Sequence, residues 1–375
     1  MRLIRIKSVA RPASKVPAWR SREVHAPGIL NASEPGTADT LALLGRPGAY
    51  AHAPPDVAIR ETHMSWVFLA GDRAYKLKKP VRFPFLDFST LARREAACRA
   101  ELVLNRRLAH DVYLDVAPLT ASPGGLAIGG DGKVVDWLVV MRRLADGGTL
   151  EQAIVAGALA RAQLDDLVSV LTRFYRTARR VCISPELHLI GWRRNLAVNR
   201  RILLDPQLGL PAGLIRHLDG VQRRFLAERG DLLRARARDR RIVDGHGDLR
   251  PEHIWLDGAV RIIDCLEFNA SLRAVDPLDE VAFLSLECER LGGGWVADYL
   301  RRRMTRALLV RPDDPLFAFY RCYRATLRAR LAIAHLLEPN PRTPEKWPRL
   351  ARTYLRFAQA DARRIERSLR TPSGR

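Results

Sequence analysis

The stretch that decides the fold covers residues 244–264 and reads DGHGDLRPEHIWLDGAVRIID. It holds two short apolar runs, residues 254–256 and residues 259–263, separated by the dipeptide Asp257-Gly258. Asp-Gly between two apolar runs is typical of a two-residue type I′ turn, in which the residues flanking the turn pair with each other. The stretch therefore predicts a tight β-hairpin.

The ladder of this hairpin predicts where the charged residues of the stretch lie. Counted back from the turn, Asp264 falls opposite Pro251. Because paired strands are roughly 4.8 Å apart, we expect Asp264 and Asp248 to share one small volume. His246 and His253 belong to the same stretch. Two carboxylates beside two histidines suit metal-assisted group transfer, although the acids could instead only cap loops.

These residues carry a resemblance to a known family. His246-x-Asp248, a short loop, a hairpin and Asp264 resemble the catalytic segment of the aminoglycoside phosphotransferase group, which has a protein-kinase-like fold. The segment IDCLEFN at residues 263–269 resembles one branch of that group. Many members of that branch carry a further P-loop ATPase domain, and we expect this chain to lack one because it ends too soon.

Five polar positions downstream also match the branch: Glu267, Asn269, Arg273, Asp276 and Asp279. Their ordinary roles would be helix capping and loop anchoring. We expect Asp276 or Asp279 to pair with Arg273 or with the loop that follows residue 244.

The resemblance implies an α+β, two-lobed protein-kinase-like fold, with a small β-rich N-terminal lobe and a larger, mostly α C-terminal lobe. We expect a disordered basic leader at residues 1–38, a nucleotide-binding lobe at 39–141, a hinge at 142–148 and a catalytic lobe at 149–370. Helical periodicity in the second lobe covers 164–178, 218–225, 279–290, 296–309, 316–337 and 344–369, with the second of these helices dissolving at 234–238.

The composition favours a globular cytoplasmic protein. The chain has 375 residues, of which 47% are hydrophobic and 28% charged, and no apolar run is long enough to cross a bilayer. The five cysteines include no Cys-x-x-Cys pair, so neither a disulfide framework nor a zinc motif is indicated. No oligomeric state follows from these numbers.

The formal net charge of +22 would attract polyanions, among them nucleic acid. The arginines are spread over nearly every segment rather than gathered on one motif, which favours a solvated basic surface. The first acidic residue is Glu23, so the start superficially resembles an organelle transit peptide. A disordered leader or a start codon assigned too early is the preferred interpretation.

A second hairpin is predicted near the start of the first lobe. Residues 61–70 and residues 73–78 are β-type runs separated by Gly71-Asp72, a dipeptide that suits a type II′ turn. The resemblance implies that this hairpin lies over the nucleotide and that the segment ending in Ser65 faces the phosphates. The segment lacks the glycine-rich signature of protein kinases.

Lys76 and Lys78 share one face of the second strand because side chains alternate along a strand. The resemblance implies that one of them holds the α- and β-phosphates, and Lys76, which follows two apolar residues, is preferred. Either could instead be an exposed strand lysine.

A helix is expected from residue 90 to about residue 109, capped by Ser89. Glu101 falls in the middle of its apolar arc, where a carboxylate is costly unless a cation meets it. A strand lysine would form the Lys–Glu pair that kinase-like folds use to hold phosphate, but Arg94 on the same arc could neutralise Glu101 instead. By resemblance, adenine faces the backbone near Met141, at the end of a strong strand over residues 134–141.

Phosphoryl transfer requires positioning and charge stabilisation more than covalent chemistry. The resemblance assigns Asp248 as the base for the acceptor hydroxyl and Asp264 as the ligand of Mg²⁺, since hard cations take oxygen ligands. His246 is expected to brace the loop by hydrogen bonds.

His253 departs from the family pattern, which has asparagine at this position. Imidazole suits zinc, copper or iron better than magnesium. The histidine could still reach a metal, including Mn²⁺. It could instead hydrogen-bond Asp248 or a phosphate, leaving the metal on Asp264, or the site could bind nucleotide without turnover.

The sequence therefore predicts an ATP-dependent kinase that phosphorylates a hydroxyl of a small-molecule acceptor. The alternatives are a nucleotide-binding regulatory protein with little turnover and a basic nucleic-acid-binding protein.

Overall fold

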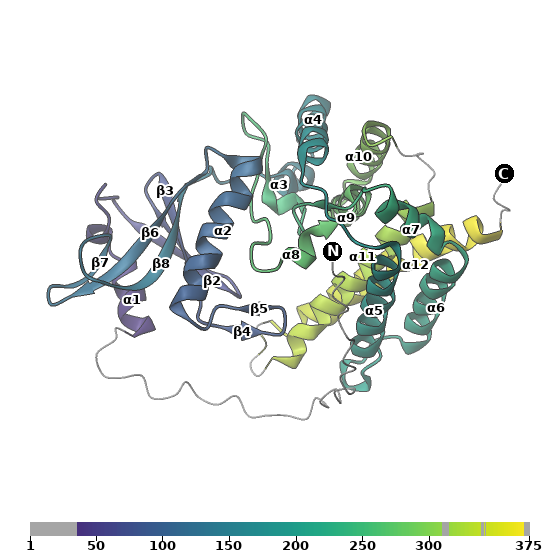
Figure 1. Ribbon diagram of the computed structural model, residues 1–375, viewed down its shortest axis with the longest axis horizontal. Helices are drawn as coiled ribbons and strands as arrows, with labels where there is room; N and C mark the ends of the chain where they lie inside the picture. Colours follow the sequence, from purple (N-terminus) through teal and green to yellow (C-terminus); the bar gives the residue numbers. More distant parts are fainter. Residues whose placement is uncertain (1–35, 310–314, 339–340, 342, 371–375) are drawn as a thin grey trace, which may run out of the picture.

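The computed structural model describes residues 36–309, 315–338, 341 and 343–370. The expected leader at residues 1–38 lies almost wholly outside the described residues. A β-rich lobe, purple to blue in Figure 1, lies beside a larger helical lobe, teal to yellow. The mixed α+β class and the two-lobed arrangement agree with the prediction.

The β-rich lobe is built on an antiparallel sheet with strand order β1-β2-β3-β8-β6-β7. One face of the sheet packs on helix α2, and the other packs on α1 and the segment ending at Tyr50. The bounds are α1 Thr37–Leu44, β1 Val57–Glu61, β2 Ser65–Ala70, β3 Arg73–Lys78, α2 Leu91–Ala109, β6 Tyr113–Ser122, β7 Gly125–Ile128 and β8 Lys133–Arg142. A small ribbon of β4 Arg82–Phe83 and β5 Leu86–Asp87 precedes α2.

The β2–β3 hairpin is as predicted. Ala70 pairs with Arg73, and Gly71 has a φ of +58°, which suits the first position of a type II′ turn. The single run expected over residues 61–70 is wrong, because β1 ends at residue 61 and β2 begins at residue 65. The Thr62 hydroxyl accepts a hydrogen bond from the Ser65 amide at 2.9 Å and thereby closes a turn between the two strands.

The start of α2 differs from the prediction by one residue. Thr90, not Ser89, is the N-cap, and its side chain accepts a hydrogen bond from the Arg93 amide at 3.3 Å. Ser89 instead donates its hydroxyl to Asp87 at 2.6 Å. Both residues have a hydroxyl that can cap a helix. Because the Ser89 hydroxyl is bonded to the Asp87 carboxylate, Thr90 caps α2.

The helical lobe contains α3 Leu150–Val155, α4 Arg161–Thr177, α5 Pro185–Leu203, α6 Ala212–Glu228, α7 Gly230–Arg238, α8 Ala270–Arg273, α9 Pro277–Arg290, α10 Gly294–Ala307, α11 Pro315–Ala334 and α12 Lys346–Arg370. The expected dissolution at residues 234–238 is wrong, because these residues are helical in α7. Leu233 and Ala237 are buried on one face of α7, and Arg236 of the same helix binds the buried Asp276. Helix α5 was not predicted.

The hairpin of the opening stretch forms with a different register. Strands β10 Ile254–Trp255 and β11 Arg261–Ile262 pair residue 254 with 262 and residue 255 with 261, one residue away from the predicted ladder. A type I′ turn needs a positive φ at both central residues, and at Asp257-Gly258 only the glycine has one, +69°. The connection is therefore longer, and Asp264 falls opposite Glu252 instead of Pro251 when this register is extended.

Candidate active site between the lobes

The cleft between the sheet and the β10–β11 hairpin holds a cavity of about 390 Å³. Six of the residues predicted to act in the site line it: Ser65, Lys76, Met141, Asp248, His253 and Asp264. The other three, Lys78, Glu101 and His246, are buried behind its wall. The loops and strands that supply these residues are far apart in sequence, so the fold itself assembles the cleft.

Lys76 links three parts of the fold at the wall of this cleft. Its Nζ donates to Glu101 Oε1 at 2.8 Å and to Asp264 Oδ1 at 2.7 Å. Burial alone would lower the pKa of Lys76, but the carboxylates of Asp264 and Glu101 outweigh it and raise that pKa well above its ordinary value. The side chain is charged and held between helix α2 and the hairpin.

Lys78 reaches the other oxygen of the same carboxylate. Its Nζ lies 2.6 Å from Glu101 Oε2 and also binds Glu267, and the lysine is only 1% exposed. Glu101, which was predicted to bind one strand lysine, therefore binds both Lys76 and Lys78. The alternative partner, Arg94, binds Asp136 instead, at 2.8 Å. Lys76 is the lysine that lines the cleft.

Asp264 follows strand β11 and has a positive φ, which is unusual for a residue other than glycine. Its φ is +64°, and its amide donates to the Tyr113 hydroxyl at 3.2 Å. Its side chain is 45% exposed, which leaves carboxylate oxygen available to the cleft. The Lys76 ammonium holds the pKa of Asp264 well below its ordinary range. The carboxylate is therefore ionised and positioned for a cation.

Asp248 lies on the loop that precedes the hairpin and also borders the cleft. Burial would raise its pKa, but the positive charge of Arg250 outweighs burial and lowers it. Arg250 donates from Nε to Asp248 Oδ2 at 3.0 Å. The carboxylate is thus ionised near neutral pH, as a general base requires. Arg250 was not predicted, because an arginine two residues from an acid is common on any surface.

His246 braces the loop, as expected. The ring is fully buried, with Nε2 2.9 Å from the Ile263 carbonyl and Nδ1 accepting from the Asp248 amide at 3.2 Å. Burial lowers the pKa of His246 to about 4, so the ring is neutral. These contacts tie the loop that carries Asp248 to the backbone immediately before Asp264.

A residue missed by the sequence reasoning holds the same loop from beneath. Glu280, fully buried in α9, accepts from the His246 amide at 3.1 Å and from the Gly247 amide. Tyr175 donates its hydroxyl to the same carboxylate at 3.0 Å. Burial raises the pKa of Glu280 despite these donors. The available signal was an acid directly before the apolar run at residues 281–284 of this helix.

His253 lies between the two acids. Its Nδ1 is 3.0 Å from the Asp248 carbonyl oxygen, so this nitrogen carries the proton, and its Nε2 is 3.8 Å from Asp264 Oδ2. Arg250 Nη2 lies 3.1 Å from Nε2 and donates to it. The contact with Asp248 is to the backbone, since the carboxylate is 3.9 Å away. The nitrogen facing the cleft is therefore already engaged by an arginine.

The prediction that Asp276 or Asp279 pairs with Arg273 or with the loop after residue 244 is wrong. Arg273 binds Asp244 at 2.8 Å, while Asp276 and Asp279 are held by arginines of other helices, Arg236 and Arg324. These buried ion pairs anchor α9 beneath the loop. Their expected anchoring role agrees with these contacts.

Ser65 and Met141 border the cleft from the sheet. Ser65 is 2% exposed, and its backbone carbonyl accepts a hydrogen bond from the Thr62 amide. Met141 pairs with Ala74 of β3 and with Tyr113 of β6. The backbone after Met141 enters the linker expected as a hinge. Their contacts with nucleotide stay predictions.

No family model matches the chain. It is 37% identical over 297 residues to Rv2004c of Mycobacterium tuberculosis, described as uncharacterized, a match covering 76% of this chain and 57% of the relative. The chain thus spans little more than half the length of that relative. Within the described residues, no helix is both long enough and apolar enough to cross a membrane.

Among solved structures, choline kinase from Cryptosporidium parvum superposes with a TM-score of 0.51 at 11% identity, covering 88% of this chain and 96% of that one. Aminoglycoside phosphotransferase APH(4)-Ia, solved with ADP and hygromycin B, gives a TM-score of 0.48 at 12% identity, covering 86% and 95%. The kinase-like architecture implied by the resemblance is confirmed: the chain has the two-lobed kinase-like fold seen in the choline kinase.

Proposed function

We propose that the protein is an ATP-dependent phosphotransferase that phosphorylates a hydroxyl group of a small-molecule acceptor. The observation that carries the proposal is the assembly of one cleft from three distant segments, which present the Lys76–Glu101 pair, Asp264 and Asp248. This set of groups meets the requirements of phosphoryl transfer, which are charge stabilisation and positioning. The fold shared with a choline kinase supports it.

Each residue has a role that follows from its contacts. Lys76, oriented by Glu101, would move its ammonium from Asp264 to the nucleotide phosphates, which offer it stronger acceptors. Asp248 is ionised, so it can orient the acceptor hydroxyl and take its proton. Met141 and the backbone beyond it would face adenine. The remaining cleft beside Asp248 would hold the acceptor.

The donors around Asp264 fit a hard divalent cation in part. The Asp264 carboxylate offers oxygen, as Mg²⁺ prefers, and Mg²⁺ would neutralise charge on the phosphates. His253 offers nitrogen where oxygen would be preferred, and that nitrogen accepts from Arg250. We therefore assign the metal to Asp264, with His253 as a weak second ligand that suits Mn²⁺ better.

The test is incubation of the protein with ATP, Mg²⁺ or Mn²⁺, and fractionated metabolite pools, followed by mass detection of a phosphorylated product. We expect one acceptor class to gain a phosphate in the wild type and not in Asp248→Asn. Absence of any phosphorylated product together with absence of ATP turnover would contradict the proposal.

A second candidate is a nucleotide-binding regulatory protein. The observation that favours it is the Arg250 guanidinium on His253 Nε2, which weakens that nitrogen as a metal ligand. ATP binding measured by calorimetry, with no hydrolysis in either metal, would favour this candidate.

A further inference from the structure

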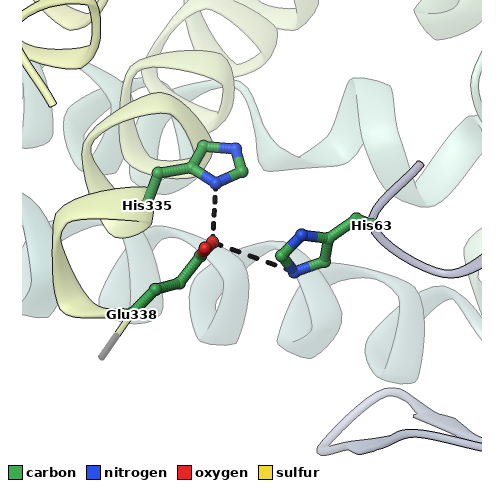
Figure 2. A group of neighbouring side chains, drawn as sticks. All are labelled: His63, His335 and Glu338. Atoms are coloured by element: carbon green, nitrogen blue, oxygen red, sulfur yellow. Dashed lines mark hydrogen bonds and ion pairs between the residues drawn. The ribbon is translucent and has the colours of Figure 1, made fainter. Parts of the chain in front are cut away.

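A cluster of potential metal ligands joins the two lobes at the edge of the cleft, apart from the residues assigned above to phosphoryl transfer. His63 lies in the turn between β1 and β2, while His335 and Glu338 lie just beyond α11 in the helical lobe (Figure 2). One nitrogen of each imidazole and one oxygen of the carboxylate all lie within 4.8 Å of one another. The three side chains converge although their segments are more than 270 residues apart in sequence.

The distances within the cluster are close to those of a metal site. Glu338 Oε1 is 2.7 Å from His335 Nδ1 and 3.8 Å from His63 Nε2. Ligand atoms bound tetrahedrally to zinc at about 2.0–2.1 Å lie roughly 3.3 Å apart. The observed separations fall on either side of that value, so small side-chain rotations would bring the three atoms to one ion.

Aromatic neighbours fix the orientation of both imidazoles. His63 stacks on Phe83 with ring centroids 5.4 Å apart and planes 19° apart. His335 stacks on Trp347 at 4.0 Å and 23°. Rings already held by packing lose less conformational freedom when they bind a ligand, and this lowers the free-energy cost of binding. The cluster is also partly exposed, so an ion and a water ligand can enter.

The 3.8 Å distance between His63 Nε2 and Glu338 Oε1 is too long for a hydrogen bond. Among the described residues, the His63 ring makes no hydrogen bond. The Glu338 oxygen therefore faces two imidazole nitrogens while hydrogen-bonding only one. Two imidazoles and one carboxylate form the three-ligand set that zinc accepts with a fourth position left for water.

We propose that His63, His335 and Glu338 bind a zinc-class divalent cation that fastens the β1–β2 turn to the helical lobe. This turn, residues 62–65, borders the cleft between the lobes, and all four of its residues, His63 included, line the cavity. A bound ion therefore restrains one edge of the cleft. The proposal does not depend on the reaction proposed for the cleft, since it concerns only the joint between turn and lobe.

Binding is tested with Zn²⁺ by calorimetry and with Co²⁺ by its visible absorption, on full-length protein treated with chelator and dialysed. The variants His63→Phe and His335→Phe keep a ring on the aromatic neighbours, and Glu338→Gln keeps an acceptor for His335. We expect one ion per chain in the wild type and more than about tenfold weaker binding in each variant, since even residues outside the ligand shell change affinity by about 10–100-fold.

His217→Ala is the matched control, because His217 Nε2 lies 3.7 Å from Glu366 Oε1 across two helices. This pair is not part of a three-ligand group in the described chain. The control should bind Zn²⁺ as the wild type does. The proposal is overturned if the wild type binds no Zn²⁺, or if any one of the three ligand variants binds it with unchanged affinity.

Fastening is tested by amide hydrogen exchange over residues 57–70. Zn²⁺ should slow exchange in the turn at least several-fold in the wild type and leave Glu338→Gln unchanged. The melting temperature without metal should be the same in both, which separates loss of a ligand from loss of folding. If zinc binds without slowing amide exchange in the β1–β2 turn, the ion does not fasten this turn to the helical lobe, and that part of the proposal is refuted.

Discussion

Lys76 and Lys78 differ in what their removal leaves behind. Both bind Glu101, but Lys76 lies at the cleft with Asp264, whereas Lys78 is enclosed with Glu267. A buried carboxylate left without its cation costs about 3–5 kcal/mol. The two lysines therefore separate catalysis from stability.

We predict that Lys76→Met lowers ATP turnover by at least about 100-fold, as removal of one stabilising donor does in other active sites. Lys78→Met should instead lower the free energy of unfolding by about 3 kcal/mol, because Glu267 loses its cation. Urea unfolding and turnover measured on both variants check this. A fully stable but inactive Lys78→Met beside an active Lys76→Met would reverse the assignment.

His253 and Arg250 predict the metal preference of the site. His253→Asn replaces a nitrogen engaged by Arg250 with an amide that offers oxygen to Mg²⁺. We expect turnover with Mg²⁺ to rise on the order of tenfold, and turnover with Mn²⁺ to change less. The exposed His217→Asn serves as the control and should change neither. Lower turnover of His253→Asn in Mg²⁺ would show that the imidazole itself is needed.

His246 predicts a loss of stability at acid pH. Its folded pKa is about 4 because the ring is buried, while the unfolded value is near 6.5. Between these values the unfolded chain binds a proton that the folded protein does not, so stability falls as pH falls from about 6.5 to 4. The total is about 3 kcal/mol.

The measurement is urea unfolding of wild type and His246→Asn at pH 7 and pH 4.5. Asparagine can donate and accept hydrogen bonds but does not titrate, so its stability should depend less steeply on pH. Other acids titrate alike in both proteins and cancel in the difference. Equal pH dependence in the two proteins would contradict a buried neutral His246.

Single residues differed in how far the sequence could predict them. Glu101 was predictable, because a carboxylate in the middle of an apolar helix face needs a cation. Arg250 was not, because its two contacts depend on how the loop after Asp248 folds. The burial of Lys78 was also not predictable, since alternation places both lysines on one face and does not say how deep each lies.

At the scale of elements, helix α9 supports the loop that carries Asp248. Glu280 accepts two backbone amides of this loop, and Tyr175 of α4 donates to the same carboxylate. Gly247 also needs its φ of +89°, and a Cβ there would lie 2.9 Å from Leu266. The loop is thus fixed both by its own backbone and by the helix below it.

We predict that Glu280→Gln destabilises the fold by about 1–3 kcal/mol, because an amide has one oxygen for the donors that share the carboxylate. Turnover should also fall, since the loop positions Asp248. Tyr175→Phe removes a single donor and should cost less. The exposed Glu345→Gln is the control for the substitution and should match the wild type in urea unfolding. A Glu280→Gln variant as stable as that control would refute the role of α9.

The hairpins show which local features a sequence can predict. Gly71-Asp72 predicted its turn correctly because the glycine occupies the one position that needs a positive φ. Asp257-Gly258 predicted a hairpin in the right place with the wrong register, because Asp257 does not adopt the left-handed conformation. The two acids still lie at one cleft, since a shift of one residue moves a strand end by only about 3.3 Å.

At the scale of the molecule, part of the basic charge is held in ion pairs, while the net charge of +22 leaves an excess that acidic residues do not balance. Arg236 of α7 and Arg324 of α11 bind acids at the start of α9, whereas Arg250 binds Asp248 within its own loop. A nucleic-acid partner is still a prediction to be tested, by salt-dependent retention on polyanions that ATP does not change. The contacts between lobes could not be predicted, because no local pattern specifies which distant segments meet.

The most direct test of the account is ATP hydrolysis by the wild type and by two matched variants. Asp248→Asn removes the base at the cleft, while Asp257→Asn makes the same change on the exposed hairpin loop. We predict slow hydrolysis with Mg²⁺ or Mn²⁺ in the wild type and Asp257→Asn, and a loss of at least about 100-fold in Asp248→Asn with nucleotide binding retained. Equal hydrolysis by all three proteins would contradict the assignment of the cleft as a phosphotransfer site.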